Sequence, residues 1–206
     1  MGETLDRLDW HRFRMEGIGG SDAPVIHGMS KYRKWHELLQ EKANQIIKDE
    51  PSNFIQQLGH EIEPKLRATF SLDYFNNTGV SDPFEPQLVV HPKKSYLRAS
   101  LDGLSVDKKT FIECKLVGDK VLMGGVVPIA YFIQMQHQYL CAGCEIGYMV
   151  MCNMKGQGTR IIPVPKDDSF IEIHKRRCKE FWDEVKKLRE ELTHKAACNE
   201  IVSGLE

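Results

Sequence analysis

The sequence predicts an α/β (α+β) protein in which helices flank a small central mixed β-sheet. The chain has 206 residues, of which 41% are hydrophobic and 28% are charged, and this is the size and composition of one domain with a buried core. The hydrophobic period is helical in the N-terminal third and at the C-terminal end, and it changes to the period of strands in between. No repeat or Pro/Gly-rich linker divides the chain, so residues 1–206 are expected to form a single domain.

Three helices are expected in the N-terminal third. The first would lie within residues 21–30, with Ser21 or Asp22 as its N-cap after two glycines. A second helix would start at Trp35 and end before Pro51, and a third would follow. The apolar stripes of these two helices are Trp35, Leu38, Leu39, Lys42 and Ile46, and then Leu58, Ile62, Leu66 and Phe70.

The middle of the chain changes to short apolar segments that are typical of strands, joined by turns at residues 107–109 and 155–158. A helix is expected from Pro128 to about Ala142, with Gly143 as its stop. The last helix would open at residues 167–169. The predicted strands are 87–91, 101–106, 110–116, 146–152 and 159–164.

The charge balance limits the classes of function. Lys plus Arg is 28 and Asp plus Glu is 29, which gives a net charge of −1. Nucleic-acid binding must therefore come from local patches, since the chain has no overall basic surface. No apolar run approaches the roughly 20 residues of a membrane span, and the N-terminus has no apolar signal segment. We therefore expect a cytoplasmic protein without a membrane partner.

The six cysteines include a Cys141-x-x-Cys144 pair, for which a zinc site, an iron–sulfur cluster and a redox role are the alternatives. A zinc site needs two more ligands, and no second Cys-x-x-Cys or histidine pair stands at the usual spacing. Small buried hydrophobic residues or surface thiols are the favoured interpretation.

Two carboxylates and a lysine form the central chemical pattern. Glu113 and Lys115 are two residues apart on an apolar strand, so both side chains leave the same face, while Ile112 and Cys114 point to the other side. Asp102 precedes Glu113 across one turn and can lie beside it on the neighbouring strand. Carboxylates bind hard divalent ions, and a lysine can position or help to deprotonate a water molecule. The alternative is a surface hairpin with a weak, solvated ion pair.

At these residues the sequence resembles the PD-(D/E)XK nuclease superfamily and, more narrowly, the YqaJ-type viral recombinase (phage lambda exonuclease) family. The strand opens with Leu-Asp instead of Pro-Asp, and the proline is not a ligand. Three further co-linear motifs carry the resemblance, which covers about residues 10 to 145. They are 10–14 with 17–23 (WHRFR and GIGGSDA), 59–64 (GHEIEP) and 131–138 (YFIQMQHQ).

The resemblance implies a metal site with a defined set of ligands. Asp102, Glu113 and the backbone carbonyl of Cys114 would bind Mg²⁺, for which Mn²⁺ would substitute, and Glu63 would help at the same or a second ion. Lys115 would activate the attacking water. His60, one helical turn before Glu63, is interpreted as a surface or supporting residue and not as a ligand.

Two further roles follow from the same resemblance. Gln134 would hold the lysine, the water or the scissile phosphate by hydrogen bonds, whereas Gln136 points away from Tyr131 and Gln138. Arg14 and Ser21 would bind a terminal 5′-phosphate, and Ser21 as a simple N-cap is the alternative.

The implied function is that of a metal-dependent 5′→3′ exodeoxyribonuclease that degrades one strand of linear double-stranded DNA in phage-type recombination. Its partners would be DNA ends, a single-strand annealing protein or recombinase, and further copies of the chain in a ring-shaped trimer. An endonuclease of restriction or repair type on the same core, or a DNA-end-binding module with a vestigial site, are the alternatives.

Overall fold

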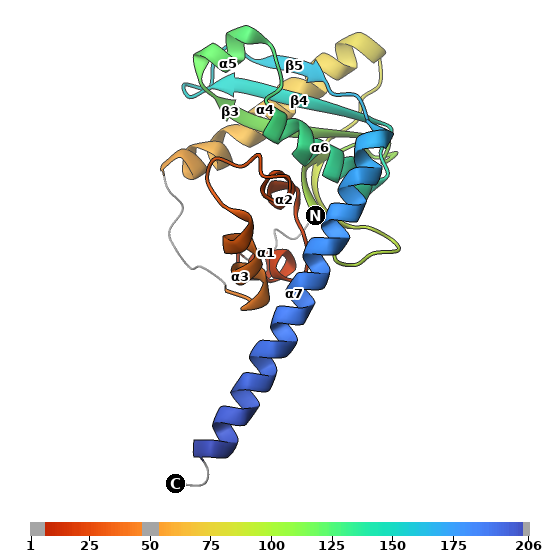
Figure 1. Ribbon diagram of the computed structural model, residues 1–206. Helices are drawn as coiled ribbons and strands as arrows, with labels where there is room; N and C mark the ends of the chain where they lie inside the picture. The colour runs from red at the N-terminus through yellow and green to blue at the C-terminus, as the bar shows by residue number, and fades with distance from the viewer. Residues whose placement is uncertain (1–6, 47–53, 204–206) are drawn as a thin grey trace.

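A five-stranded mixed sheet forms the centre of the protein, with the strand order β1-β2-β3-β4-β5. The structure is a computed structural model that describes residues 7–46 and 54–203. Strands β3 and β4 are parallel, and the other neighbours are antiparallel (Figure 1). The strands are β1 Glu85–Val90, β2 Arg98–Leu104, β3 Thr110–Val117, β4 Ile146–Asn153 and β5 Arg160–Pro163.

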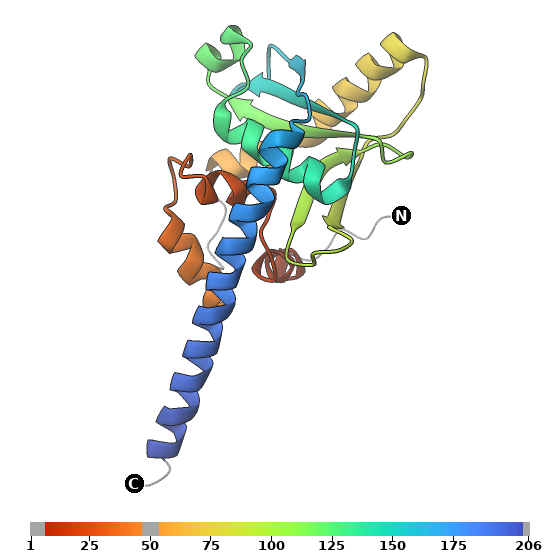
Figure 2. The same ribbon diagram turned by 45° about the vertical axis from the view of Figure 1, so that its right-hand side comes forward.

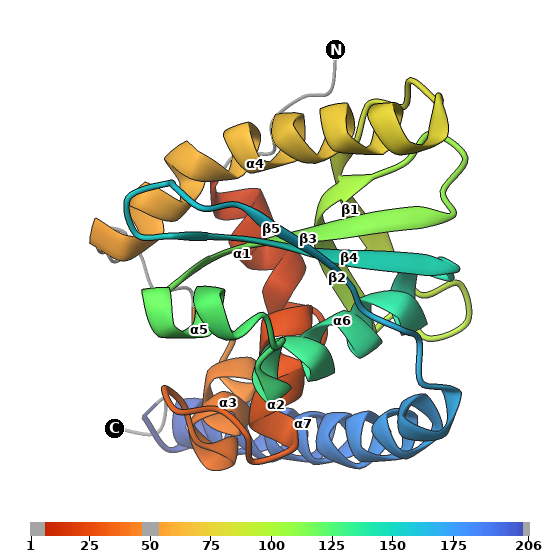
Figure 3. The same cartoon turned by 90° about the horizontal axis from the view of Figure 1, so that it is seen from above.

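Helices cover both faces of this sheet. Helix α4 lies along one face, and α2, α3, α6 and α7 lie on the opposite side (Figure 3). The α/β class with a mixed sheet flanked by helices is therefore confirmed. The helices are α1 Arg7–Met15, α2 Ala23–Ile26, α3 Trp35–Ala43, α4 Phe54–Thr78, α5 Asp119–Gly124, α6 Ile129–Ala142 and α7 Asp168–Ser203.

The side chains of β3 alternate between two hydrophobic cores, as the sequence predicts. Phe111 belongs to the larger core, which α6 and α7 cover. Ile112 and Cys114 belong to the smaller core beneath α4. Glu113 and Lys115 therefore project toward α6, and this alternation places the charged residues on the side of the helix that carries the glutamines.

The predicted strands all form, with end points shifted by at most three residues. Helices α1 and α5 were not predicted. Four of the nine residues of α1, RLDWHRFRM, are arginine or aspartate, and the apolar residues form no continuous stripe, so its period carries no helical signal. Helix α3 ends at Ala43, before the predicted Ile46, because Gln45 has a φ of 51°. Pro51 lies outside the described residues.

The first predicted helix is shorter than expected. A 3₁₀ turn, Gly20–Asp22, precedes the four residues of α2, and neither Ser21 nor Asp22 caps α2, although the Asp22 carboxylate accepts the backbone N–H of Gly19 (2.9 Å) before the turn. Asp22 is instead a fully buried carboxylate that binds Arg33 (2.5 Å), Lys42 (2.8 Å) and Arg14 (3.5 Å). Burial by itself raises the pKa of Asp22, but these three cations hold it well below its usual value.

Helix α7 extends beyond the body of the protein after crossing α6 and α3 (Figures 1 and 2). The Arg189 guanidinium donates to the carbonyls of Lys42 (2.8 Å) and Met15 (2.9 Å), and the Trp182 ring stacks on Tyr96. These contacts fasten α7 to the N-terminal segment and to the connection between β1 and β2. None of the helices in the described part of the chain is both long and apolar enough to cross a membrane.

The buried Asp22–Lys42 pair generates a stability prediction. Lys42→Met should lower the free energy of unfolding by about 3 kcal/mol, because the variant removes one partner of a buried ion pair. Urea denaturation measures this loss. Lys179→Met is the matched control, since Lys179 is an exposed lysine paired with Asp183 on α7 and its removal should change stability far less. Equal decreases in the free energy of unfolding of the two variants would show that the buried ion pair stabilises the protein no more than the exposed one.

Candidate active site

Strands β2 and β3 separate at the point where Asp102 lies. Their ladder pairs Gly103 with Ile112 and Leu104 with Phe111. Asp102 is the residue before Gly103 on β2, and its carboxylate accepts the backbone N–H of Cys114 (2.7 Å). The N–H and the carbonyl of a strand residue point toward the same neighbour, so the Cys114 carbonyl also faces the gap beside Asp102. The opening between the strands thus places an acidic side chain next to a backbone carbonyl.

Glu113 occupies the centre of the site and is only 1% exposed. One of its oxygens accepts hydrogen bonds from Lys115 and from the Gln134 amide (2.6 Å), and the other accepts one from the Gln138 amide. The Lys115 ammonium also lies 5.8 Å from the centre of the Tyr131 ring. Three donors from β3 and α6 therefore fix the orientation of this carboxylate.

The electrostatic environment of the site is negative. Burial raises the pKa of Asp102 well above its usual value, and the neighbouring carboxylate of Glu113 raises it further. Burial by itself lowers the pKa of Lys115, but Glu113 and Asp102 outweigh it and raise the pKa above its usual value. Lys115 is therefore an ammonium group that donates hydrogen bonds.

Helix α4 brings Glu63 to the edge of the site. The Arg67 guanidinium donates to the Glu63 carboxylate (3.0 Å) and to the backbone carbonyl of Asp102 (2.7 Å). Glu63 is also close enough to contribute to the raised pKa of Asp102. The structure thus places Glu63 beside Asp102 but paired with Arg67. The side chain of His60 is exposed one turn earlier.

The donor set suits a hard divalent cation. The carboxylates of Asp102 and Glu113 and the Cys114 carbonyl offer oxygen atoms, and a cation would offset both the burial of Asp102 and its repulsion by Glu113, which together raise its pKa. Among the described residues, the Gln138 Oε1 atom is buried without a hydrogen-bond partner, although the Nε2 atom of the same amide holds Glu113. A water molecule or the hydrated ion would satisfy such an atom.

The predicted phosphate-binding residues lie together, next to the glutamine helix. The Arg14 guanidinium donates to the Ser21 hydroxyl (2.9 Å) and stacks 4.7 Å from the Trp10 ring. A Cβ atom at Gly20 would lie 3.2 Å from Gln134 Cγ, so the backbone beside Ser21 approaches α6 closely. The structure therefore brings the Arg14–Ser21 pair within reach of the Glu113 site.

Two residues of the site were not chosen from the sequence. Gln138 was recognised as sharing a face with Gln134 but was not assigned a role, because its partner Glu113 is 25 residues away. Arg67 carried no sequence signal of its own. The prediction for Gln136 is confirmed, since its amide bonds to the Pro165 carbonyl (2.8 Å) on the other side of α6.

The mixed sheet, the helices on its two faces and the Asp-Glu-Lys site define a protein of the nuclease fold. The chain belongs to the family of YqaJ-like viral recombinase domains, whose model matches residues 9–145. The uncharacterized protein YqaJ of Bacillus subtilis is 25% identical over 185 residues, which are 87% of this chain. The chain spans 56% of the length of that relative.

Solved structures support the fold independently. The alkaline exonuclease LHK-Exo of Laribacter hongkongensis superposes with a TM-score of 0.75 at 25% identity, covering 92% of this chain and 98% of that one. Its complex with dAMP gives the same TM-score at 26% identity with the same coverage. A phage-related exonuclease of Haemophilus somnus shares the fold, with a TM-score of 0.61 at 14% identity over 85% of this chain and 96% of that one.

The raised pKa of Asp102 predicts a pH-dependent cost in stability. A carboxyl group with a raised folded pKa destabilises the folded state as the pH rises above its unfolded value of about 3.9. Asp102→Asn keeps an oxygen that can accept the Cys114 N–H and removes the charge. In EDTA it should raise the free energy of unfolding by about 1–2 kcal/mol at pH 8 and change it little at pH 4.

Denaturant titrations at the two pH values measure this difference. Asp73→Asn, at an exposed position of α4, is the matched control and should show no such gain at pH 8. A wild type and an Asp102→Asn variant of equal stability at pH 8 would show that burial and the neighbouring Glu113 do not make the ionised Asp102 carboxylate unfavourable.

Proposed function

We propose that the protein is a Mg²⁺-dependent exodeoxyribonuclease that degrades one strand of linear double-stranded DNA from its 5′ end. The observation that carries this proposal is the meeting of Asp102, Glu113 and Lys115 at the gap between β2 and β3. The similarity to an alkaline exonuclease supports it. The dAMP complex of that relative supports a deoxynucleotide as the unit of the substrate.

Each residue of the site would have a distinct task. Asp102, Glu113 and the Cys114 carbonyl would hold Mg²⁺, and Glu63 would assist once released from Arg67. The ion, when bound, supplies Lewis-acid stabilisation of the charge on the phosphate and lowers the pKa of water. Gln134 and Gln138 hold the Glu113 carboxylate in one orientation. Lys115 donates hydrogen bonds from its ammonium group, so its proposed role is to orient the attacking water and stabilise negative charge.

A nuclease assay tests this proposal directly. With Mg²⁺ or Mn²⁺ the wild type should degrade end-labelled linear duplex and leave covalently closed plasmid intact. Asp102→Ala and Glu113→Ala should abolish hydrolysis while the protein stays folded. Lys115→Ala should lower the rate by at least about 10²–10³-fold, the scale for one electrostatic or proton-handling group.

The control and the other outcomes are equally specific. Lys179→Ala, a lysine on α7 remote from the site, should leave the rate unchanged. Cleavage of closed plasmid would instead indicate an endonuclease. Binding to duplex ends without hydrolysis of any substrate would indicate an end-binding module. Near-wild-type turnover in Lys115→Ala would refute the role of the lysine.

Arg14 and Ser21 would select the DNA end. A terminal 5′-phosphate carries more negative charge than an internal phosphodiester, and the cluster that contains Arg14 has an excess of cations. Arg14, Arg33 and Lys42 face the carboxylates of Asp22 and Glu41, which leaves one positive charge in surplus. The Arg14 side chain is 24% exposed and can reach such a group.

The predicted consequence is a preference for phosphorylated ends. The wild type should digest 5′-phosphorylated duplex about tenfold or more faster than 5′-hydroxyl duplex, and Arg14→Ala should remove most of that difference. Arg12→Ala, an exposed arginine on the same helix paired with Asp9, is the matched control and should keep the preference. Equal wild-type rates on the two ends would show that the pocket is misassigned, even if the enzyme is a nuclease.

The wider setting of the activity is also proposed from the family. A chain with a net charge of −1 holds a polyanion weakly at long range, so a ring-shaped trimer around the duplex would keep the enzyme on its track. The single strand produced would be passed to an annealing protein or recombinase. Phage-type recombination in the cytoplasm of a bacterial host is the corresponding context.

A further inference from the structure

Two facing helices of the larger core carry the same pair of residues at the same spacing. His137 and Cys141 are four residues apart on α6, and His174 and Cys178 are four residues apart on α7. Residues at this spacing lie on one face of a helix, one turn apart. All four side chains are buried, with exposed fractions of 3% or less. His137, His174 and Cys178 thus meet at the contact between α6 and α7, and Cys141 lies beside His137.

The ligand atoms are close to tetrahedral distances. His137 Nδ1 lies 2.9 Å from His174 Nε2, and His174 Nε2 lies 3.4 Å from Cys178 Sγ. One potential ligand atom from each of these three residues lies within 4.8 Å of those of the other two. A tetrahedral ion with Zn–N of about 2.0 Å and Zn–S of about 2.3 Å has edges of about 3.3 Å and 3.6 Å. A small outward movement of the side chains would therefore admit a zinc ion.

Contacts on the far side of each imidazole orient it as a ligand. His137 Nε2 faces the backbone carbonyls of Ile18 (3.0 Å) and Arg98 (2.9 Å). Carbonyl oxygens only accept hydrogen bonds, so Nε2 carries the proton and the lone pair of Nδ1 points inward. His174 Nδ1 lies 2.9 Å from His27 Nε2, which gives that ring an outer partner as well. Metal-bound histidines in proteins are commonly held in this way.

Both histidines are neutral at neutral pH and so have lone pairs to offer. Burial lowers the pKa of His174 to about 2, with smaller contributions from His137 and His27. Burial also lowers the pKa of His137. Neutral imidazole is the form that binds metal ions.

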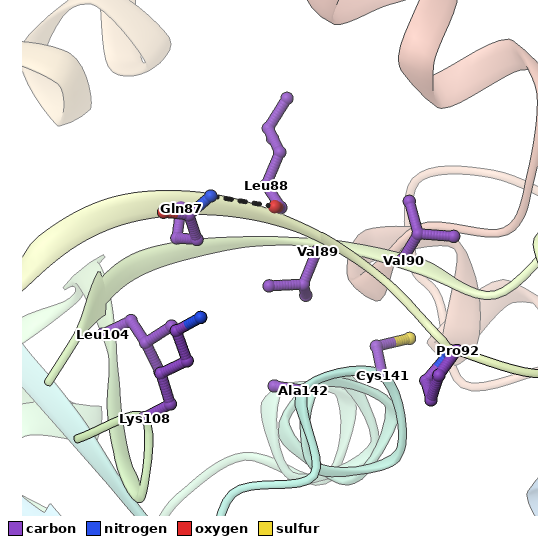
Figure 4. Close-up of a pocket in the computed structure, with 9 residues that line it drawn as sticks. All are labelled: Gln87, Leu88, Val89, Val90, Pro92, Leu104, Lys108, Cys141 and Ala142. Carbon is purple, nitrogen blue, oxygen red and sulfur yellow. Dashed lines mark hydrogen bonds between the residues drawn. The ribbon is translucent and has the colours of Figure 1, made fainter. Parts of the chain in front are cut away.

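Cys141 is the cysteine next to these three residues, but its thiol lies at the outer nitrogen of His137 and must turn to reach them. Its Sγ lies 3.3 Å from His137 Nε2, on the side of α6 that forms a wall of a hollow of about 310 Å³ beneath β1. Figure 4 shows the Cys141 side chain at this hollow, directed from α6 toward Pro92. The fourth ligand therefore requires a rotation of the thiol about its Cα–Cβ bond toward Cys178, away from the hollow, which neither histidine nor Cys178 lines.

We propose that His137, His174, Cys178 and Cys141 form a structural Cys₂His₂ site for one Zn²⁺ ion that fastens α7 to α6. The charges favour this composition, because two thiolates and one Zn²⁺ have no net charge in a core where an unpaired charge is costly. Binding releases two protons, one from each thiol. The His174 proton moves to Nδ1, where it is donated to His27, and His27 carries its own proton on Nδ1.

The site would support the helix that orients Glu113. His137 lies between Gln134 and Gln138 on α6, and both glutamines donate to the Glu113 carboxylate from the neighbouring face. Fastening α6 to α7 would restrict the movement of these donors. The inference does not require that the protein is a nuclease.

Metal binding to the full chain tests the proposal. The protein is stripped with a chelator, mixed with Zn²⁺ or Co²⁺ and passed through gel filtration. About one Zn²⁺ per chain should be retained, the Co²⁺ form should show a thiolate-to-cobalt charge-transfer band, and Zn²⁺ should raise the melting temperature. His27→Ala should weaken Zn²⁺ binding about tenfold or more, and Cys178→Ser should weaken it further.

Two controls separate this site from others. Cys152→Ser removes a fully buried thiol in the smaller core and should leave Zn²⁺ binding unchanged. The double variant Asp102→Ala/Glu113→Ala should also retain the ion, whereas loss of binding there would place the ion at the nuclease site and overturn the proposal. The Co²⁺ spectrum of the wild type requires no variant to fold. Absence of the charge-transfer band, or equal Zn²⁺ binding in wild type and Cys178→Ser, would likewise overturn it.

Discussion

The hydrogen bonding of the buried Glu113 carboxylate is the interaction on which the rest of the site depends. Glu113 lies on β3, and its three side-chain donors are Lys115 from the same strand and Gln134 and Gln138 from α6. A buried carboxylate without these donors would be strongly disfavoured, so the sheet and the helix must keep a fixed distance and register. The position of α6, and through it the positions of Ser21 and α7, follows from this requirement.

Charge is divided unequally between the two polar clusters of the protein. Around Asp22 the cations outnumber the carboxylates, and the pKa of Asp22 is lowered. Around Glu113 three carboxylates, those of Asp102, Glu113 and Glu63, face two cations, Lys115 and Arg67, and the pKa of Asp102 is raised. The first cluster is stable as it stands and can attract an anion, whereas the second has an unfavourable negative charge that a cation would relieve. Gly20 approaches Gln134 closely, so the proposed phosphate site would lie beside the proposed metal site, as the proposed end-dependent hydrolysis would require.

Helix α6 joins these features because each of its faces has a different partner. Gln134 and Gln138 face the Glu113 carboxylate, and Gln136 bonds to the segment before α7 through the Pro165 carbonyl. His137 contacts His174 of α7. Four polar residues so close together, 134 and 136–138, would be unfavourable in a buried helix without partners, and each of these side chains has one. The helix is therefore specified by polar contacts as much as by apolar packing.

The sequence by itself determined the strands, the long helices and the Asp102–Glu113–Lys115 pattern, because alternation along β3 is a local property that one strand displays in its own residues. It also predicted correctly that the Gln136 side chain points away from Gln138. Only the tertiary structure decided that Gln138 bonds Glu113, that Arg67 pairs with Glu63, and that His137 meets His174 across 37 residues. It also replaced the expected cap at Asp22 by a buried ion cluster and revealed α1, whose charged sequence has no apolar period. These contacts join residues on separate elements, and their free energy depends on burial and distance after the chain has folded, which no periodicity in the sequence encodes.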